Sequence, residues 1–357
     1  MIANRRHWRR LGSAAAVAVL TSTTMITAAV AADAADVTCQ VNGSTLSGRT
    51  ITGTVGSDII FCPDGVRRGT TVDGGAGDDI ITATGTPGTL DSAGLNPTSG
   101  GIGNEGTVNG GDGNDKITVT GGAGTASSSG KSSSGGDGNQ GTIRGDSGDD
   151  SIIVTGGSGG TVTSTQTGVS PGPGGRGGRG SASRSAARID GDAGLDVILV
   201  TGGAGGSSTV STKGGAGGDG SLNAIGGGSG PDLITITGGT GGSGDAGGSG
   251  GLGVIGRTFE GNGGLDVITV IGGDGGSGTA IGGPGGDGAA FFANLLGGEG
   301  NDELAVLGGV GGLGAGGAAR TGSGLVSGVM DGGAGINTCQ SAPRTGAGAT
   351  FRNCVRI

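Results

Sequence analysis

The sequence predicts an all-β protein built as a parallel β-solenoid, or β-roll, of about eight to nine glycine-rich repeats, with extended loops on one edge. Similar segments begin at Gly53, Gly74, Gly110, Gly145, Gly191, Gly227, Gly261, Gly297 and Gly332, so successive starts are 21, 36, 35, 46, 36, 34, 36 and 35 residues apart. Self-similarity at such a period is the signature of a repeat architecture. The chain has 98 glycines among 357 residues and only 2% aromatic residues, which is too little for an ordinary core. Each repeat must therefore bury its apolar side against its neighbours.

Each repeat contains two short strands joined by a tight glycine turn. The segment "GGDGNDKITVTGG" (110–122) illustrates the shared pattern G-x-x-G-x-D-x-U-x-U, in which U is apolar. Its Ile117 and Val119 alternate with polar residues, which predicts a strand with these two side chains pointing inward. A second, weaker strand precedes the turn and carries an apolar residue such as Val108 or Ile143. Stacked repeats would then form two parallel sheets with Ile/Val stripes facing each other.

The sixth position of the motif is aspartate in eight of the nine repeats. These residues are Asp58, Asp79, Asp115, Asp150, Asp196, Asp232, Asp266 and Asp302. Stacked strands lie about 4.8 Å apart, so adjacent carboxylates would repel each other by roughly 1 to 3 kcal/mol per pair. A hard cation between successive turns would reverse the sign of this interaction, and Ca²⁺ prefers ligation by carboxylate and carbonyl oxygens. We therefore expect the eight aspartates to be Ca²⁺ ligands.

The repeats resemble the haemolysin-type (RTX) calcium-binding nonapeptide, G-G-x-G-x-D-x-U-x, over about residues 53 to 339. The resemblance implies a β-roll that binds Ca²⁺ through the aspartate carboxylates and turn carbonyls and folds when calcium is supplied. The chain departs from the family pattern because only one edge carries the motif. In the loops of the other edge, Asp219 and Asp287 lie in stretched relatives of the motif and Gln140 replaces the aspartate, so calcium is not expected there. The last repeat has Asn337 at the aspartate position, consistent with a final coil that has no successor.

The N-terminus predicts export. Residues 1–31 combine a basic start, an apolar middle and the small residues Ala29, Val30 and Ala31, which is typical of a signal peptide. A retained membrane anchor is the alternative, but no later apolar run could span a bilayer. We expect a mature chain without a membrane span that is secreted and lies outside the cell or at its surface. We divide it into an N-terminal cap (32–72), a repeat solenoid (73–338) and a C-terminal cap (339–357).

The cysteines predict a disulfide in each cap. Cys39 and Cys62 lie at the N-terminal end, whereas Cys339 and Cys354 lie at the C-terminal end. In an exported protein four cysteines indicate two disulfides. Three pairings are possible, and the local one (39 with 62, 339 with 354) is favoured because the ends of a solenoid lie far apart.

The glycine-rich loops allow two interpretations. We interpret part of each loop as flexible linker. The alternative is a packed arrangement of extended, polyproline-II-like segments, and the tracts also resemble those of mycobacterial PE-PGRS surface proteins. The longest insertion holds Arg176, Arg179, Arg184 and Arg188 and is similar to an RGG nucleic-acid segment. We interpret it as a solvated loop, with contact to an anionic envelope polymer as another use.

Charge and composition favour a structural role without catalysis. The net charge is −9; loss of four arginines with the signal peptide would leave 16 basic and 29 acidic residues, or −13. Cations rather than nucleic acids are therefore the expected partners. The only histidine, His7, would leave with the signal peptide, which excludes histidine-based triads. We expect a secreted calcium-binding structural or cell-surface-associated protein and no enzyme activity; a lyase acting on polysaccharides is the least favoured alternative.

The outward threonines of the main strand suggest another function. They are Thr82, Thr84, Thr118, Thr120, Thr155, Thr201, Thr235, Thr237 and Thr269. Stacked into a ladder they would resemble the ice-binding face of some calcium-dependent β-solenoids, and a polymer is a second ligand for such a face. Ile153, Leu199, Ile271 and Leu307 interrupt the array, and ordinary β-propensity explains threonine in strands. The same face could instead bind another copy of the chain or be covered by the loops.

Overall fold

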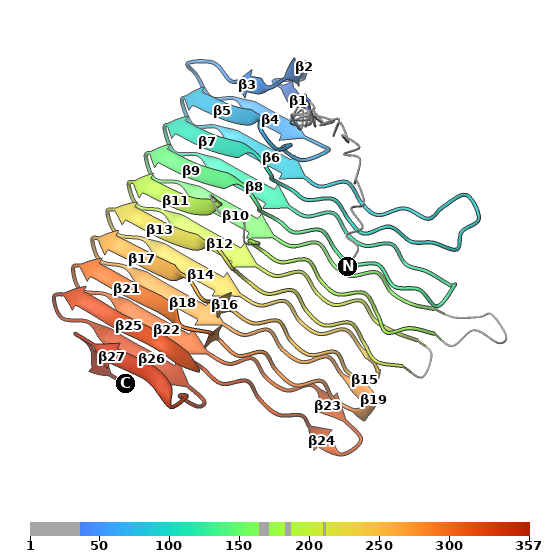
Figure 1. Ribbon diagram of the computed structural model, residues 1–357. Helices are drawn as coiled ribbons and strands as arrows, with labels where there is room; N and C mark the ends of the chain where they lie inside the picture. The colour runs from blue at the N-terminus through green and yellow to red at the C-terminus, as the bar shows by residue number, and fades with distance from the viewer. Residues whose placement is uncertain (1–35, 164–170, 183–186, 210–211) are drawn as a thin grey trace, which may run out of the picture. The chain divides into compact units, whose positions relative to one another are not determined.

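The computed structural model describes residues 36–163, 171–182, 187–209 and 212–357. The predicted signal peptide and Arg184 lie outside the described residues. Within those residues the chain is all-β, and no helix is long and apolar enough to cross a membrane. The predicted fold class is confirmed: the chain forms a parallel β-solenoid of about seven turns (Figure 1).

The 12-stranded sheet, here called sheet A, carries the main strand of each repeat. All its neighbours from β4 to β28 are parallel, whereas β1 pairs antiparallel with β2 and β4. Its strands are β1 (Val37–Val41), β2 (Ser44–Gly48), β4 (Ile59–Cys62), β6 (Ile80–Thr84), β8 (Lys116–Thr120), β10 (Ser151–Thr155), β12 (Val197–Thr201), β14 (Leu233–Thr237), β18 (Val267–Ile271), β22 (Glu303–Leu307), β26 (Thr338–Ala342) and β28 (Val355–Arg356).

The 10-stranded sheet, here called sheet B, carries the second strand of each repeat and is parallel throughout. Its strands are β3 (Thr50–Thr52), β5 (Thr71–Ala76), β7 (Thr107–Asp112), β9 (Thr142–Ser147), β11 (Arg188–Ala193), β13 (Ala224–Ser229), β17 (Thr258–Gly263), β21 (Ala293–Glu299), β25 (Ser327–Ala334) and β27 (Gly348–Arg352). Three small pairs complete the fold: β15 (Gly244–Ala246) with β19 (Gly278–Ile281), β16 (Val254–Ile255) with β20 (Ala289–Ala290), and β23 (Leu313–Gly314) with β24 (Gly317–Ala318).

The core lies between the two sheets, as the alternation of apolar residues predicted. In sheet A, Ile117 and Val119 are fully buried, and the in-register residues of the neighbouring strands continue both stripes. In sheet B, Val108 and Ile143 face them and are also fully buried. One connected cluster contains the buried side chains of both sheets. Stacking of coils thus supplies the core that a single glycine-rich repeat lacks.

The predicted count of eight to nine repeats is slightly too high. Long glycine-rich loops, here called excursions, follow β6, β8, β10, β12, β14, β18 and β22. Each excursion leads from sheet A to the next strand of sheet B and so completes a turn of the solenoid. The repeats that start at Gly53 and Gly332 lack such an excursion and belong to the ends of the solenoid. The motif therefore continues into short terminal coils, where the long loop is missing.

Both predicted disulfides form with the local pairing. Cys39 of β1 is bonded to Cys62 of β4, and Cys339 of β26 is bonded to Cys354 just before β28. Cys39, Cys62 and Cys339 are fully buried in the core cluster. Each bond therefore joins a terminal coil to its neighbour, where a repeat array otherwise frays.

A third line of contacts, not predicted from the sequence, runs between the loops and sheet B. Isolated parallel bridges join Asn104 to Asn139, Asn139 to Ser181 and Ser181 to Ser221. All four side chains are fully buried. The Asn104 amide donates a 2.8 Å hydrogen bond to Asn139 Oδ1, so this polar row is satisfied internally. The repeated "GN" of "GGIGNEG" and "GGDGNQG" was the available signal.

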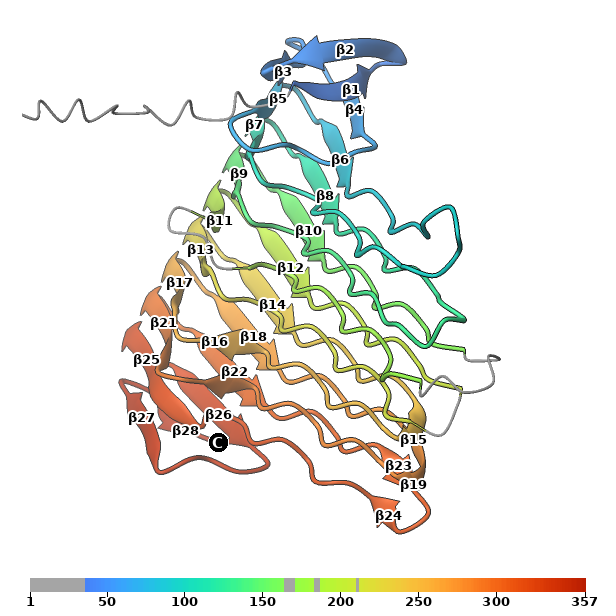
Figure 2. The same ribbon diagram turned by 45° about the vertical axis from the view of Figure 1, so that its right-hand side comes forward.

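The glycine-rich loops form two stacked layers of extended chain. Each excursion leaves sheet A in one segment and returns to sheet B in another (Figures 1 and 2). Outgoing segments of adjacent coils bond to each other; for example, the Gly124 amide donates to the Ser158 carbonyl at 2.7 Å, and the Gly159 amide donates to the Ala204 carbonyl at 2.8 Å. Return segments bond likewise, as the Gly135 amide does to the Arg176 carbonyl at 2.9 Å.

A row of hydrogen bonds, here called the glycine zipper, joins the two layers. Its members alternate between outgoing and return segments. The backbone N–H of each member donates to the carbonyl of the preceding member of the row, at 2.6–2.9 Å. In order, the zipper contains Thr86, Gly101, Gly122, Gly136, Gly157, Gly178, Gly203, Gly218, Gly239, Gly251, Gly273, Gly286, Gly309 and Gly322. A second row runs from Ser133 to Ala319 in the same manner. The interpretation of these loops as flexible linker is therefore wrong for the described residues, which form the packed, extended alternative.

Close approach of adjacent coils within a layer explains why these positions are glycine. A Cβ at Gly203 would lie 2.0 Å from the Gly157 carbonyl oxygen, and one at Gly122 would lie 1.9 Å from the Thr86 carbonyl oxygen. Both distances are far below van der Waals contact, so a side chain would force the coils apart. The next residue after Gly203, Ala204, is exposed, so a side chain is accommodated there. Glycine content here encodes tight packing.

Candidate metal centre

The eight predicted ligand aspartates form a continuous buried ladder. Each follows the tight turn that leads from a sheet B strand to the next sheet A strand. Their side chains are only 0–3% exposed, and Asn337 continues the ladder at 2%. The structure therefore brings all the predicted residues together in one line along the solenoid, on the inside of the turns.

One carboxylate oxygen of each aspartate has a fixed partner. Oδ1 of Asp115 accepts a hydrogen bond from the Asp79 backbone N–H, and Oδ1 of Asp150 accepts one from the Asp115 N–H, both at 2.7 Å. The same bond recurs from the Asp58 N–H to the Asn337 side chain with distances of 2.7–3.0 Å. Each rung thereby ties one coil to the next, and half of every carboxylate is satisfied.

The other oxygen, Oδ2, is buried and has no hydrogen-bond partner in seven of the rungs. These rungs are Asp79, Asp115, Asp150, Asp196, Asp232, Asp266 and Asp302. A buried polar atom without a partner costs free energy, and a buried charge costs more. Seven identical orphans in a row mean that the turns contain a recurring element that requires a positive partner.

The space beside six of the seven orphan oxygens, all but that of Asp232, is lined by a carbonyl of the next coil. A Cβ placed on Gly74 would lie 2.3 Å from Asp79 Oδ2 and 2.3 Å from the Gly110 carbonyl oxygen. The same holds at Gly191, where Asp196 Oδ2 is 2.2 Å away and the Gly227 carbonyl 2.4 Å away. Because glycine has no side chain, the space between the Oδ2 atom and the carbonyl oxygen stays open. We call this space, which is lined by oxygen atoms, the cradle.

Asn337 shows what the cradle accepts. Its Nδ2 donates hydrogen bonds to the Asn353 and Gly333 carbonyls at 3.1 and 3.4 Å. A Cβ on Gly332 would lie 2.6 Å from this nitrogen and 2.5 Å from the Asn353 carbonyl, which is the arrangement of the aspartate rungs. Nδ2 therefore occupies the place that Oδ2 occupies elsewhere. In an aspartate rung, oxygen faces oxygen, so a proton or a cation is needed between them.

The first rung differs from the others because its carboxylate is fully satisfied. The Thr54 backbone N–H donates to Asp58 Oδ2, and the Asn42 side chain donates to Asp58 Oδ1. The Thr54 hydrogen bond is the main reason that the pKa of Asp58 lies below its ordinary value. Of the eight predicted ligands, Asp58 therefore has the least need of a cation. Asn42 was missed by the sequence analysis because it lies outside the repeat.

Burial raises the pKa of the remaining rungs. Desolvation is the largest cause, the hydrogen bond from the preceding rung opposes it, and neighbouring carboxylates add to it in most rungs. The pKa reaches about 6 at Asp115, Asp196 and Asp266, and about 7 at Asp150 and Asp232. Asp79 and Asp302 shift in the same direction. At neutral pH the ladder thus either retains protons or takes up compensating positive charge.

The donor set fits a hard cation only if backbone carbonyls take part. Among the described residues, no three histidine, cysteine, aspartate or glutamate side chains converge in a way that could hold a metal ion. Each interval between rungs instead offers carboxylate oxygens of adjacent aspartates and the carbonyls of the glycine turn. Such an all-oxygen set suits Ca²⁺ better than softer metals.

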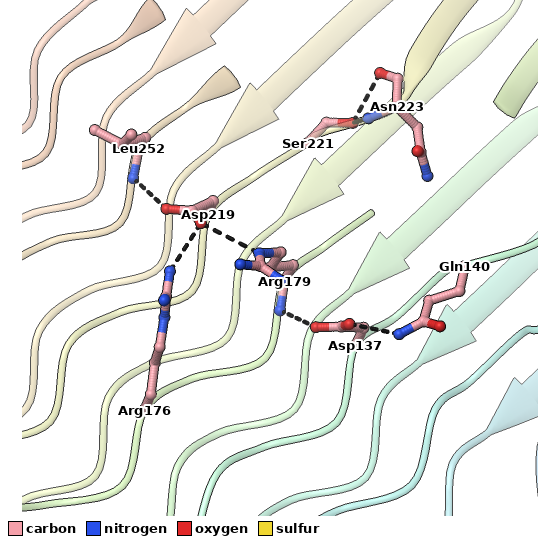
Figure 3. Close-up of polar contacts among 8 residues, drawn as sticks. All are labelled: Asp137, Gln140, Arg176, Arg179, Asp219, Ser221, Asn223 and Leu252. Carbon is pink, nitrogen blue, oxygen red and sulfur yellow. Dashed lines mark hydrogen bonds and ion pairs between the residues drawn. The ribbon is translucent and has the colours of Figure 1, made fainter. Parts of the chain in front are cut away.

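On the loop edge the acidic residues are already paired (Figure 3). Asp219 Oδ2 accepts hydrogen bonds from Arg176 Nη2 at 2.8 Å and Arg179 Nε at 3.3 Å, and its Oδ1 accepts one from the Leu252 N–H at 3.1 Å. Asp137 accepts hydrogen bonds from the Arg179 N–H and the Gln140 side chain. The carboxylates of Asp137 and Asp219 therefore have hydrogen-bond partners within the protein, unlike the orphan oxygens of the ladder.

The same contacts correct the interpretation of the arginine-rich insertion as a solvated loop. Arg176 and Arg179 neutralise the buried Asp219, and Arg188 forms an ion pair with the buried Asp190. Arg176 and Arg179 thus balance an acidic residue of the next coil, whereas Arg188 balances one in its own strand, β11.

The outward threonines stack in register on sheet A. Thr84, Thr120, Thr155, Thr201 and Thr237 occupy equivalent positions of successive strands, followed by Ile271 and Leu307. In the adjacent line, Ile153 and Leu199 separate the threonines of β8 and β14. The threonine ladder is therefore continuous in one line and interrupted by apolar residues in the other.

A comparison with protein-family models finds no match, and a comparison with curated proteins finds none either.

Proposed function

We propose that the chain is a secreted, calcium-binding structural repeat protein of the RTX type, without enzyme activity, that is free or attached at the cell surface. Ca²⁺ is the proposed ligand of the turns, and the proposed ligand residues are the aspartates of the ladder. The two disulfides support an oxidising location outside the cell. The net charge of −9 supports attraction of cations.

The observation that carries the proposal is the row of seven buried Oδ2 atoms, six of which lie beside a carbonyl oxygen of the next coil. Bound Ca²⁺ would supply the positive charge that this geometry lacks. The residues of the chain would supply everything else: Oδ1 fixes each carboxylate through the backbone N–H of the preceding rung, and the glycines let the carbonyls approach. Calcium binding and folding are then coupled, because the cradle exists only when coils are stacked.

Calcium binding is tested by isothermal titration of the mature chain, after chelator treatment, with CaCl₂ and MgCl₂. Extracellular calcium modules bind at roughly 0.1 to 1 mM, so the titration extends to about 10 mM. We expect several calcium ions per chain and weaker binding of Mg²⁺, whose rigid octahedral demand a carbonyl cradle does not meet. Absence of saturable calcium binding would refute the proposal.

Asp196→Asn is the sharpest variant, because Asn337 shows that asparagine fits the ladder. The variant retains Oδ1 for the Asp150 N–H and offers Nδ2 to the carbonyl, so the rung no longer needs a cation. We expect a lower calcium stoichiometry with unchanged far-UV circular dichroism. The matched control is Asp274→Asn at an exposed loop position, which keeps the acceptor for the Val310 N–H and should bind calcium as the wild type does. Equal stoichiometry in Asp196→Asn and wild type would remove this aspartate from the ligand set.

A further inference from the structure

Over six central strands, one line of side chains on the outer face of sheet A has an apolar centre flanked by opposite charges. The parallel register places Lys116, Ser151, Val197, Leu233, Val267 and Glu303 at the same position of six successive strands. Lys116 and Glu303 are exposed, while Val197 and Leu233 are 36% and 41% exposed. The order of this line, here called the K–E line, is therefore cation, polar, three apolar residues, anion.

Apolar residues beside the K–E line widen it into a patch. Leu195 and Leu265 lie in the adjoining turns and are 49% and 56% exposed, with the exposed Pro231 in the turn between them. Leu199 lies on the other side of the line, in β12, and is 36% exposed. Together these residues cover β12, β14 and β18 without an intervening charge. Contiguous apolar patches with a polar rim mark interaction surfaces.

The charge pattern fits a second copy of the same face. A rotation by 180° about an axis parallel to the strands, lying between β12 and β14, reverses the order of the strands. Lys116 then lies opposite Glu303 of the second copy, and Val197 lies opposite Leu233 of the second copy. Both copies have the same five strand intervals between the two charges, about 24 Å at a spacing of about 4.8 Å. Both ends of the line therefore meet opposite charges in one arrangement.

We propose that the outer face of sheet A is a two-fold interface between two copies of this chain. The strands of the two sheets pack in the aligned manner of a β-sandwich, with about 10 Å between the sheets. Such an interface is isologous, so one patch serves both copies. A two-fold axis perpendicular to the strands would place Lys116 against Lys116, so the charges select the parallel axis. The proposal does not depend on calcium.

A second copy explains this face better than ice or an ordered polymer does. Those ligands require a regular array of hydroxyl groups, yet the most exposed part of the face is aliphatic and its two ends carry charge. The threonine line from Thr84 to Thr237 lies beside the patch and would be covered at its centre by the second copy. Ice and polymer binding are therefore competing outcomes of the same test.

The test is the mass of the disulfide-intact mature chain by sedimentation velocity between about 1 and 100 μM. We expect a dimer for the wild type, and at least a tenfold weaker dimer for Lys116→Glu and for Glu303→Lys, since each creates like charges at both ends of the interface. The double variant K116E/E303K restores opposite charges and should recover the wild-type dissociation constant to within about threefold. Leu233→Gln should weaken the dimer without changing its salt dependence.

The control is Glu299→Lys, which makes the same charge change at an exposed position of sheet B. It should leave the dimer unchanged, and far-UV circular dichroism should be the same for every variant. A wild type that stays monomeric at 100 μM overturns the proposal, as does a double variant weaker than both single variants. Thermal hysteresis, or co-sedimentation of the monomer with an insoluble polysaccharide, abolished by Leu233→Gln, would assign the face to the competing ligand and overturn it too.

Discussion

Replacing one rung of the aspartate ladder by asparagine should stabilise the calcium-free protein at neutral and alkaline pH. In Asp150→Asn the new Nδ2 can donate to the Gly191 carbonyl, as that of Asn337 does to the Asn353 carbonyl, while Oδ1 continues to accept the Asp115 N–H. The folded-state pKa of Asp150 is about 7 against an ordinary value of 3.8. At about 1.4 kcal/mol per tenfold change in proton affinity, the ionised carboxylate costs the folded chain about 4 kcal/mol above pH 7.

The sign of the pH dependence follows from the raised pKa. This carboxyl contributes full stability below its unfolded pKa near 4, and the contribution is lost as the pH rises through about 7. We expect the urea midpoint of the wild type in chelator to decrease as the pH is raised from 4.5 to 8. The midpoint of Asp150→Asn should decrease less. Excess calcium should raise the midpoint of the wild type at pH 8 and that of the variant by less.

The assay is urea unfolding followed by far-UV circular dichroism, in chelator and in 10 mM CaCl₂, at pH 4.5, 6 and 8. Asp274→Asn serves as the control, because this exposed loop residue lies outside the ladder and should leave the pH dependence unchanged. If Asp150→Asn is less stable than the wild type at pH 8 in chelator, the orphan Oδ2 does not face a carbonyl as described. If stability in chelator falls with pH but calcium restores none of it, the ladder holds protons and not calcium.

Two further predictions concern the loops and the C-terminal cap. Gly203→Ala places a Cβ 2.0 Å from the Gly157 carbonyl oxygen. We expect it to destabilise the chain by about 3 kcal/mol and to speed amide hydrogen exchange in the zipper. Ala204→Ser, at the neighbouring exposed position, should change neither, and equal exchange in both variants would contradict the tight packing of the loops. Removing the Cys339–Cys354 bond, whose cysteines are 15 residues apart, should cost about 3 kcal/mol of chain entropy, and limited proteolysis should then begin in β27 and β28 and not in the central coils.

The core stripe and the aspartate ladder could be predicted from the sequence, because each residue in them packs against the equivalent residue of an adjacent repeat. Ile117 and its equivalents mark the core stripe, Asp115 and its equivalents mark the ladder, and the four cysteines mark the caps. In the stripe and the ladder, the neighbour in space is the equivalent residue of the next repeat. The spacing of the motif therefore encodes the packing directly.

Other features depend on partners that periodicity does not identify. Local propensity predicts that Gly122 is flexible. In the structure it is fixed by hydrogen bonds to Gly101 and Gly136, which lie in other loop segments and cannot be identified from the residues around Gly122. The carboxylate of Asp219 is satisfied by Arg176, which lies in an insertion found in one repeat only. The orientation of each ladder carboxylate follows from backbone positions in two coils. The three-residue Gly-Gly-x period of the loops was the available signal that they pack in a regular structure, and the sequence analysis missed it.

The glycine zipper has a direction, and this direction suits a chain that becomes available from its N-terminus. Every amide in the row donates to a carbonyl that lies earlier in the sequence, from Gly101 onto Thr86 to Gly322 onto Gly309. When a coil leaves a ribosome or an export channel, the acceptors for its zipper amides have therefore already emerged. The hydrogen bonds within each layer and along the aspartate ladder run the other way, from an earlier amide to a later acceptor. The zipper can thus hold a new coil on the preceding ones before the next coil completes those bonds.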